Sequence, residues 1–236
     1  MADTQGAIGY ALQQNLYNDF RRLGLDKEVA TVVTQVEVDP ADPAFSEPSK
    51  PIGGYMDEAA ATRRIAEGWR VAEEPGKGWR RLVASPRPRR IVESPIVRRL
   101  IDAGFVVIAA GGGGIPVVRD ESGFLKGVEA VVDKDLVSAL LASALDASTL
   151  IISTTVEKAA LDFGTPQQRW IDRLTVDEAK GYLDEGVHFG RGSMAPKIRA
   201  IIKFIADGGR AGLITNGENL ERAVAGETGT LITGSS

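Results

Sequence analysis

Strand-like apolar runs alternate with helical patterns along most of this sequence. Apolar and β-branched residues dominate six short runs, at 29–38, 105–110, 127–132, 149–154, 210–215 and 230–233. Segments with helical spacing or helix caps lie between them, at 8–20, 57–68, 94–104, 133–145, 175–185 and 194–206. Continuous apolar strands joined by helices are typical of parallel sheets that helices cover. The alternation therefore predicts an α/β layered fold with a mostly parallel central sheet.

Polar residues of capping type mark several of the expected helix boundaries. Thr175 and Glu178 have the spacing of a capping box, in which each side chain binds the other's backbone N–H. Asp133, Ser193 and Ser94 each stand at the start of a helical segment and are good N-cap residues. These positions predict where three further helices begin.

Residues 39–93 differ in composition from the rest of the chain. Four prolines between 39 and 51 exclude regular structure there, because proline lacks a backbone donor and has a fixed φ. The turn Pro75-Gly76-Lys77-Gly78 separates two strand-like runs and predicts a hairpin. We therefore expect residues 39–93 to form a small subdomain inserted into the layered domain.

Composition excludes several classes of chemistry. The 236 residues contain no cysteine and one histidine, His188, so thiolate sites, disulfides and multi-histidine metal sites are excluded. The most apolar segment, 105–118, carries four consecutive glycines and is too short to span a bilayer. Met1-Ala2-Asp3 lacks the basic and apolar regions of a signal peptide. We expect a cytoplasmic protein that does not bind membranes.

Nucleic acid is not the expected partner. The formal net charge is −4, whereas nucleic-acid-binding domains are usually basic. One stretch is rich in arginine but has few aromatic residues between the arginines on which bases could stack. Its basic residues are Arg80, Arg81, Arg87, Arg89 and Arg90. We interpret this stretch as a solvated face or as a clamp on an acidic substrate.

Four consecutive glycines, Gly111 to Gly114, directly follow an expected strand. Glycines can adopt positive φ and let a ligand approach backbone N–H groups, which suits an anion. A tight turn is the alternative, although four glycines exceed what a turn needs. No Gly-Lys-Ser/Thr follows, so the segment is not a Walker A loop.

Two expected helix starts carry lysines. In Asp133-Lys134-Asp135 the carboxylates can act as ordinary caps, but Lys134 opposes the helix dipole, and an anionic ligand there would explain its position. In the segment 190–197 a glycine-rich loop enters a helix whose first turn carries Lys197. A solvated lysine is the alternative there, and His188 is expected to pack or hydrogen-bond rather than act as a base.

Together these sites favour a nucleotide-dependent phosphoryl transferase. Phosphoryl transfer depends on positioning and charge neutralisation more than on acid–base groups. The shortage of histidine and cysteine is consistent with that chemistry.

Several segments in series resemble the carbamate kinases of the amino acid kinase superfamily. They are Thr4-Gln5-Gly6-Ala7-Ile8-Gly9-Tyr10, residues 31–38, residues 109–118, residues 127–135 and Gly192-Ser193-Met194-Ala195-Pro196-Lys197. The similarity runs from residue 3 nearly to the C-terminus, in the family's order. It implies a three-layer α/β/α sandwich over residues 1–236, with 39–93 as a protruding, lid-like subdomain and 125–236 as the nucleotide-binding part.

The resemblance also implies a reaction and residue roles. The family transfers a phosphoryl group reversibly between ATP and carbamate, giving ADP and carbamoyl phosphate, often in arginine or agmatine breakdown. By motif position, Lys134 and Lys197 would neutralise the migrating group, Asp135 would hold the lysines, and Gly111, Gly112 and Gly113 would lie near the carbamate. Residues along the nucleotide would be Thr154, Thr155, Asp162, Gly164, Met194 and Pro196. Mg²⁺ would bind mainly through nucleotide phosphates, and the enzyme would be a homodimer.

The sequence departs from the family at its N-terminal end and at two further positions. The family begins with a strand, a Gly-Gly-Asn loop and a His-Gly-Asn-Gly-Pro-Gln segment, which this sequence lacks. Thr155 and Ala160 stand where relatives can carry aspartate and tyrosine. The expectation is a shortened carbamate kinase. A non-catalytic remnant that binds nucleotide or pairs with a full-length subunit is the alternative, and a sister kinase acting on a carboxylate is disfavoured by the Asp-Lys-Asp motif.

Overall fold

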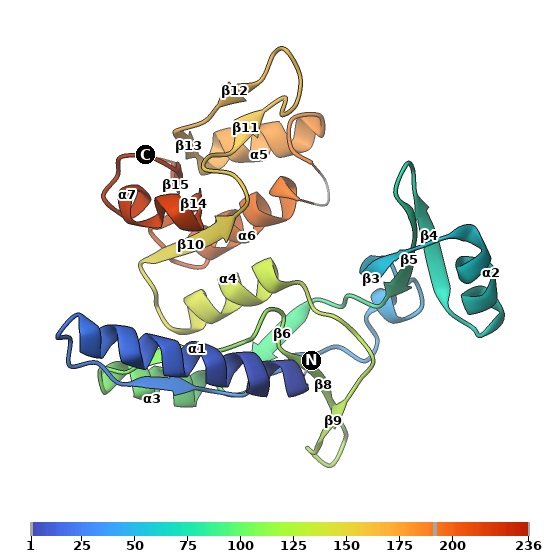
Figure 1. The fold of residues 1–236 in the computed structure, drawn as a ribbon, viewed down its shortest axis with the longest axis horizontal. Coiled ribbons are helices and arrows are strands. Elements are labelled where there is room, and N and C mark those ends of the chain that lie inside the picture. The colour runs from blue at the N-terminus through green and yellow to red at the C-terminus, as the bar shows by residue number, and fades with distance from the viewer. Residues whose placement is uncertain (1, 191–192, 236) are drawn as a thin grey trace. The chain divides into compact units, whose positions relative to one another are not determined.

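The structure, a computed structural model, describes residues 2–190 and 193–235 and divides into two compact units, Met1–Val137 and Ser138–Ser236 (Figure 1). No helix in the described residues is long and apolar enough to cross a membrane.

The first unit contains a long N-terminal helix, several short parallel and antiparallel strand pairs, and an antiparallel subdomain. Its elements are α1 (Ala2–Arg22), β1 (Val29–Thr31), β2 (Gln35–Val38), the short 3-10 helix η1 (Pro43–Phe45), β3 (Lys50–Met56), α2 (Glu58–Ala66), β4 (Arg70–Glu74), β5 (Gly78–Val83), β6 (Pro88–Ile91), α3 (Ser94–Asp102), β7 (Val106–Ile108), β8 (Ile115–Arg119), β9 (Leu125–Gly127) and the start of α4 (Lys134–Ala144).

Three sheets organise this unit. β1 pairs in parallel with β7, and α1 packs against both strands. β2 lies between antiparallel β6 and parallel β8, and β9 continues antiparallel to β8. Residues 50–83 form the separate antiparallel sheet β3-β5-β4 with α2 beside it, whereas β6, which lies within the expected 39–93 insertion, pairs with β2 in another sheet. The hairpin joins β4 to β5 as the Pro-Gly turn predicts.

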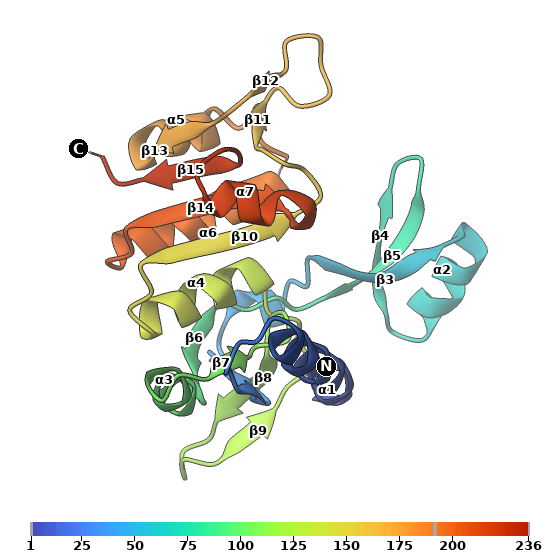
Figure 2. The ribbon, with the colours of Figure 1, turned by 60° about the vertical axis from the view of Figure 1, so that its left-hand side comes forward.

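The main sheet of the second unit has four strands and carries helices on both faces (Figure 2), and residues 160–161 and 169–170 form a separate antiparallel pair. Its elements are the remainder of α4, β10 (Thr149–Thr154), β11 (Ala160–Leu161), β12 (Arg169–Trp170), β13 (Arg173–Thr175), α5 (Val176–Glu185), α6 (Met194–Ala206), β14 (Ala211–Asn216), the short 3-10 helix η2 (Gly217–Asn219), α7 (Leu220–Val224) and β15 (Thr230–Thr233). The strand order is β10-β14-β15-β13, with β10–β14 and β13–β15 parallel and β14–β15 antiparallel.

The core of the second unit lies between α6 and the sheet. Ile198, Ile201 and Phe204 recur every three residues on α6 and are fully buried. Gly212 on β14 leaves room for this helix, because a Cβ there would lie 2.1 Å from Ile201 Cγ2. The next residue, Leu213, points to the opposite face, the side of α7. The predicted α/β class with parallel strand pairs is confirmed.

The structure confirms most helix boundaries and corrects the cap of α3. Thr175 and Glu178 form the reciprocal capping box of α5. The helix α3 begins at Ser94, but Glu93 occupies the N-cap position and Ser94 Oγ donates to the Ile91 carbonyl instead. The cap prediction for Ser94 was therefore one residue late.

Three expectations about strands were wrong in detail. The run at 29–38 is two strands, β1 and β2, which are separated at Thr34. The Thr34 N–H donates to Gln5 Oε1 and its hydroxyl donates to the Val32 carbonyl, so these groups do not continue a strand. The run at 127–132 is not a strand, since β9 ends at Gly127. Regular structure also enters 39–51, since η1 lies there and Pro51 sits in β3, an edge strand that tolerates proline.

Candidate active site

The glycine run follows β7 as a loop packed against the segment that enters α4. Ala110, Gly111, Gly112 and Gly114 all have positive φ, between 52° and 101°. Gly113 needs the absence of a side chain for another reason: a Cβ there would lie 1.9 Å from the Val132 carbonyl oxygen. The run is thus more than a tight turn, and it brings the loop beside the N-terminus of α4.

Asp133 caps α4 and also binds a lysine from the subdomain. Its Oδ1 accepts from the backbone N–H groups of Asp135 and Leu136, at 2.9 and 3.4 Å, as the cap prediction requires. Its Oδ2 lies 2.7 Å from Lys50 Nζ. Burial raises the pKa of Asp133, but the Lys50 ammonium and the two N–H groups outweigh it, so the pKa lies below its usual value.

Lys50 is a residue that sequence reasoning missed. It lies in the proline-rich stretch, and its partner is 83 residues further along the chain, so no local pattern marks it. Lys134 is exposed in the first turn of α4, and Asp135 beside it is only 6% exposed. The structure therefore gathers Gly113, Asp133 and the Lys134–Asp135 pair around one helix N-terminus in the first unit.

A cavity of about 580 Å³ occupies one end of the second unit, where β10 ends. It is lined by Thr154, Thr155, Val156, Lys158, Ala160, Asp162, Phe163, Thr165, Gly186, Val187, His188, Phe189, Gly190, Ser193 and Met194. The ends of parallel strands in α/β sheets are common ligand sites. The cavity therefore has the position and the mixed apolar and polar lining of a small-molecule pocket.

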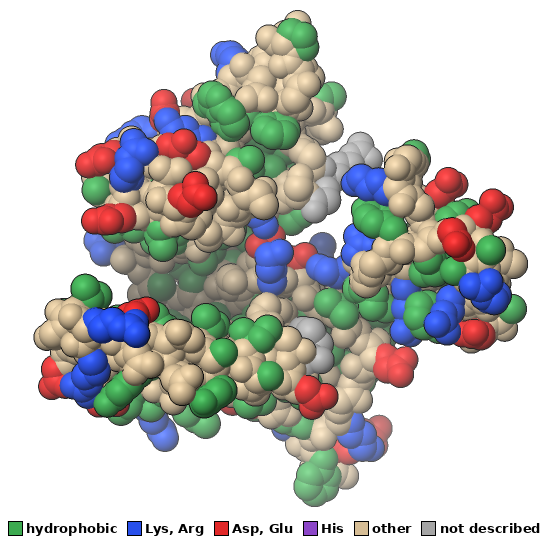
Figure 3. Space-filling view, viewed as in Figure 1, with side chains coloured by type: hydrophobic (Ala, Val, Ile, Leu, Met, Phe, Trp, Pro, Cys, Tyr) green, Lys and Arg blue, Asp and Glu red, His purple; other side chains and the backbone are tan. Residues whose placement is uncertain are grey.

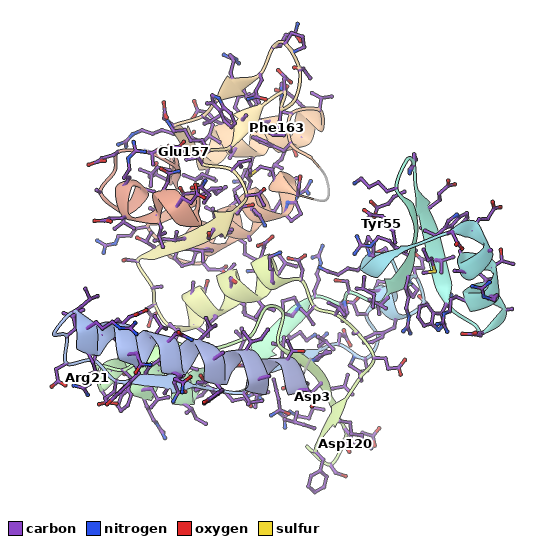
Figure 4. All side chains as sticks on the ribbon, viewed as in Figure 1. Asp3, Arg21, Tyr55, Asp120, Glu157 and Phe163 are labelled. Atoms are coloured by element: carbon purple, nitrogen blue, oxygen red, sulfur yellow. The ribbon has the colours of Figure 1, made fainter. Side chains whose placement is uncertain are left out.

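Four of the six predicted nucleotide residues, Thr154, Thr155, Asp162 and Met194, line this cavity, whereas Gly164 and Pro196 are not among its described lining residues. Phe163, labelled in Figure 4, follows β11, is 61% exposed and meets the Trp170 ring edge-on. Lys158, missed from the sequence, is the lysine among the described lining residues, and its Nζ lies 2.6 Å from Asp172 Oδ1.

His188 bridges two carboxylates at the cavity wall. Its Nδ1 lies 2.7 Å from Asp162 Oδ1 and its Nε2 lies 2.7 Å from Glu185 Oε2. The Tyr182 ring meets the imidazole edge-on. The hydrogen bond to Asp162, followed by the one to Glu185, raises the pKa of His188. As expected from the sequence, this histidine is a hydrogen-bonding residue, and it ties the α5–α6 connection to the turn after β11.

Raising the pH should loosen this bridge. A histidine whose pKa is raised on folding stabilises the fold fully below its unfolded pKa, and the contribution is lost as pH rises through its folded pKa. The chain has one histidine and no cysteine, so few other groups titrate between about pH 6 and 9. We expect the melting temperature to fall across that interval, measured by scanning fluorimetry in buffers of constant ionic strength.

The His188→Gln variant serves as the comparison for this pH dependence. It keeps a polar side chain of similar length but cannot gain a proton. We expect its melting temperature to vary less with pH than that of the unmodified chain. Parallel curves for the two proteins would contradict the role of the bridge.

Lys197 lies in the first turns of α6. It is 8% exposed, unlike a solvated lysine. Met194, three residues earlier on the same face of the helix, lines the cavity. Ser193 occupies the N-cap position without a side-chain bond to the helix, so its predicted capping role is wrong. Arg191 and Gly192 lie outside the described residues.

The arginine-rich stretch is largely engaged in pairs inside the first unit. Arg89 binds Asp39, Arg90 lies 3.0 Å from Glu37, and the Arg81 guanidinium stacks 4.2 Å from the Trp69 ring. Arg80 stacks on Tyr55 and reaches Glu74. Basic and acidic side chains are interspersed over this part of the surface (Figure 3). The stretch is therefore a mixed-charge surface rather than a basic patch.

Comparisons with known proteins give matches to one family. The model of the amino acid kinase family matches residues 53–216. The carbamate kinase of Thermococcus kodakarensis is 48% identical over 98% of this chain and 73% of its own length, and the carbamate kinase-like protein YahI of Escherichia coli is 50% identical over 98% and 73%. The solved structure of Giardia lamblia carbamate kinase bound to AMP-PNP has a TM-score of 0.89 at 38% identity, over 99% of this chain and 74% of that one.

Proposed function

This chain belongs to the carbamate kinases of the amino acid kinase family, and we propose from that membership how its own residues carry out the reaction. The reaction is reversible phosphoryl transfer between ATP and carbamate. A carbamate oxygen attacks the γ-phosphorus, the bond from that phosphorus to the β–γ bridging oxygen breaks, and ADP and carbamoyl phosphate form. The observation that carries this proposal is the 48% identity to a carbamate kinase across 98% of the chain.

The nucleotide would occupy the cavity of the second unit. A relative bound to AMP-PNP, an ATP analogue, supports nucleotide binding by this fold. Phe163 and Met194 offer apolar surface for the base, and Thr154 and Thr155 at the end of β10 offer hydroxyls. Ala160 adds little bulk to the wall, so the base would contact Phe163 rather than a side chain at position 160. Gly164 and Pro196 would lie along the nucleotide, close in the chain to the lining residues Phe163 and Met194.

Charge neutralisation would come from Lys134 and Lys197. Phosphoryl transfer develops negative charge on the phosphoryl oxygens, and positioned lysines stabilise that charge. Asp135 would orient the lysines, and Gly111, Gly112 and Gly113 would hold the carbamate and phosphoryl end with backbone N–H groups. Burial of Lys197 supports its role, because a charge kept out of water interacts more strongly with a nearby phosphate.

Mg²⁺ would be bound chiefly by the nucleotide itself. No group of three or more His, Cys, Asp or Glu side chains that could hold a metal gathers within 2–190 and 193–235. Mg²⁺ commonly binds through substrate phosphates with few protein ligands, which suits this donor set. When bound, it would neutralise phosphate charge alongside the lysines.

The remaining parts of the proposal follow from the family resemblance. Residues 39–93 would close over the carbamate as a lid, with Lys50 linking this subdomain to the cap of α4. Residues 125–236 would supply most nucleotide contacts. The enzyme would work as a cytoplasmic homodimer, with a role in arginine or agmatine breakdown.

The direct test is ATP formation from ADP and carbamoyl phosphate, measured by luciferase luminescence with the purified chain and Mg²⁺. We expect ATP to appear above the rate of a no-enzyme control. A second arm measures ADP binding by calorimetry. Binding without ATP formation would favour a non-catalytic nucleotide-binding protein, and the absence of both would contradict the proposal.

A further inference from the structure

A buried amide from α1 reaches across the first unit to the start of the glycine loop. Gln5 is 5% exposed, and its Nε2 donates to the carbonyl oxygens of Thr34 and Ala110, at 3.1 and 3.2 Å. Its Oε1 accepts from the Thr34 N–H at 2.8 Å. Gln5 is thus bonded to residues 29 and 105 positions away in the chain.

Thr34 completes the network from the break between β1 and β2. It is fully buried, and its Oγ1 accepts from the Ala110 N–H at 2.8 Å. Both polar backbone groups of Ala110 are therefore held, the N–H by Thr34 and the carbonyl by Gln5. Ala110 has a φ of 66°, a left-handed conformation that disfavours residues with a Cβ. The network stabilises this conformation at the residue from which the loop departs.

The Gln5 side chain also packs against the loop itself. A Cβ on Gly111 would lie 2.6 Å from Gln5 Cγ, so the loop passes closely over the stem of the side chain. Gln5, Gly111 and Gly112 share the lining of a cavity of about 300 Å³ beside α1. The loop is therefore in close contact with Gln5 at Gly111 and with the Val132 carbonyl at Gly113.

We propose that Gln5 is a positioning residue: through Thr34 and Ala110 it fixes the backbone of the Gly111–Gly113 loop in the shape that receives the carbamate and phosphoryl groups. This proposal rests on the proposed function of that loop. It assigns to α1 a part in the reaction that requires no contact between Gln5 and a substrate.

An amide is suited to this place because its NH2 group can donate to both carbonyl oxygens while its oxygen accepts from the Thr34 N–H. The Thr34 and Ala110 carbonyls keep second partners, the N–H groups of Ile115 and Gly114. Removing the amide therefore chiefly leaves the Thr34 N–H without its acceptor and removes one of the two hydrogen bonds that hold the Ala110 carbonyl. A glutamate would instead place a carboxylate against two carbonyl oxygens, which disfavours its charged form and raises its pKa.

The test compares Gln5→Ala with Gln14→Ala in the full chain. Gln14 lies on the same helix, is exposed, and donates only to the Tyr10 hydroxyl among the described contacts. We expect Gln5→Ala to lower kcat/KM for carbamoyl phosphate by about 10- to 100-fold, as misplaced reacting groups do, with the KM for ADP within about twofold. Gln14→Ala should match the unmodified chain in both constants.

A pH profile of Gln5→Glu separates positioning from simple loss of fold. A protonated carboxyl can donate to one carbonyl and accept from the Thr34 N–H, so activity should recover relative to the unmodified chain as pH falls. Unchanged constants in Gln5→Ala, or equal losses for both substrates without recovery in Gln5→Glu, would overturn the proposal.

A second measurement separates this proposal from the proposed function. In ¹⁵N-glycine-labelled protein, Gln5→Ala should shift the amide signals of Gly111 to Gly114 but leave those of Gly208 and Gly209 in place. If the unmodified chain forms no ATP, the proposed function fails, and this spectrum alone decides the role of Gln5. Unmoved loop signals would then overturn it.

Discussion

Replacing Lys197 with alanine is expected to lower the turnover number for ATP formation by about 10²–10³-fold, the scale seen when one partner of transition-state charge is removed. Lys197 is buried in α6, one turn from Met194, which lines the cavity of the second unit where we propose that the nucleotide binds. A charge on a largely buried side chain interacts more strongly with a nearby phosphate than a solvated charge does, so losing Lys197 should remove strong stabilisation of the migrating phosphoryl group. The measurement is kcat from ADP and carbamoyl phosphate at saturating concentrations of both.

Lys203 provides the matched control for this substitution. It lies on the same helix, is exposed, and pairs with Asp207 at 2.8 Å. Removing an exposed pair of this kind changes stability little, so Lys203→Ala should keep near-normal turnover. If Lys197→Ala remained as active as Lys203→Ala, the charge-neutralising role of Lys197 would be wrong.

Replacing Gly113 with alanine is expected to damage both stability and activity. Its Cβ would lie 1.9 Å from the Val132 carbonyl oxygen, a backbone atom that cannot move without shifting the entry to α4. Overpacking of this kind typically lowers the free energy of unfolding by about 1–3 kcal/mol. Displacing the loop should also lower kcat/KM for carbamoyl phosphate by about 10²-fold. Urea unfolding and steady-state kinetics measure the two effects.

The same substitution at Gly127 is the comparison. Gly127 lies in the same unit, at the end of β9, where an added Cβ would have no heavy atom within 4 Å and where φ is not positive. Gly127→Ala should therefore leave the unfolding midpoint and kcat/KM nearly unchanged. Equal effects at the two positions would show that close packing of the loop is not what requires glycine at 113.

Local sequence patterns predicted correctly those elements that depend on interactions between residues close together in the chain. The capping box of α5 involves residues three apart, and the hairpin between β4 and β5 follows from a Pro-Gly turn. The bounds of α6, Met194–Ala206, are those that the sequence predicts for the helix at 194–206. The motif order identifies the family, which the comparisons confirm.

Errors arose where a distant partner competes with local preference. The apolar run at 29–38 breaks into two strands because Thr34 forms hydrogen bonds with Gln5 and Ala110. Residues near Thr34 in the sequence give no indication of these bonds. Pro51 enters a strand because β3 lies at the edge of its sheet, where no bond from its nitrogen is needed. Edge position is a property of the assembled sheet.

The sequence by itself determined the alternating α/β pattern and the family, and it indicated Gly111 to Gly113, Lys134 and Lys197 as candidate site residues. Only the tertiary structure decided which groups hold those residues in place. Lys50 reaches Asp133 from 83 positions away, His188 bridges Asp162 and Glu185, and Gln5 reaches Ala110 across 105 positions. Hydrogen bonds act over about 3 Å in space, so distance along the chain conceals these pairs until the fold brings them together.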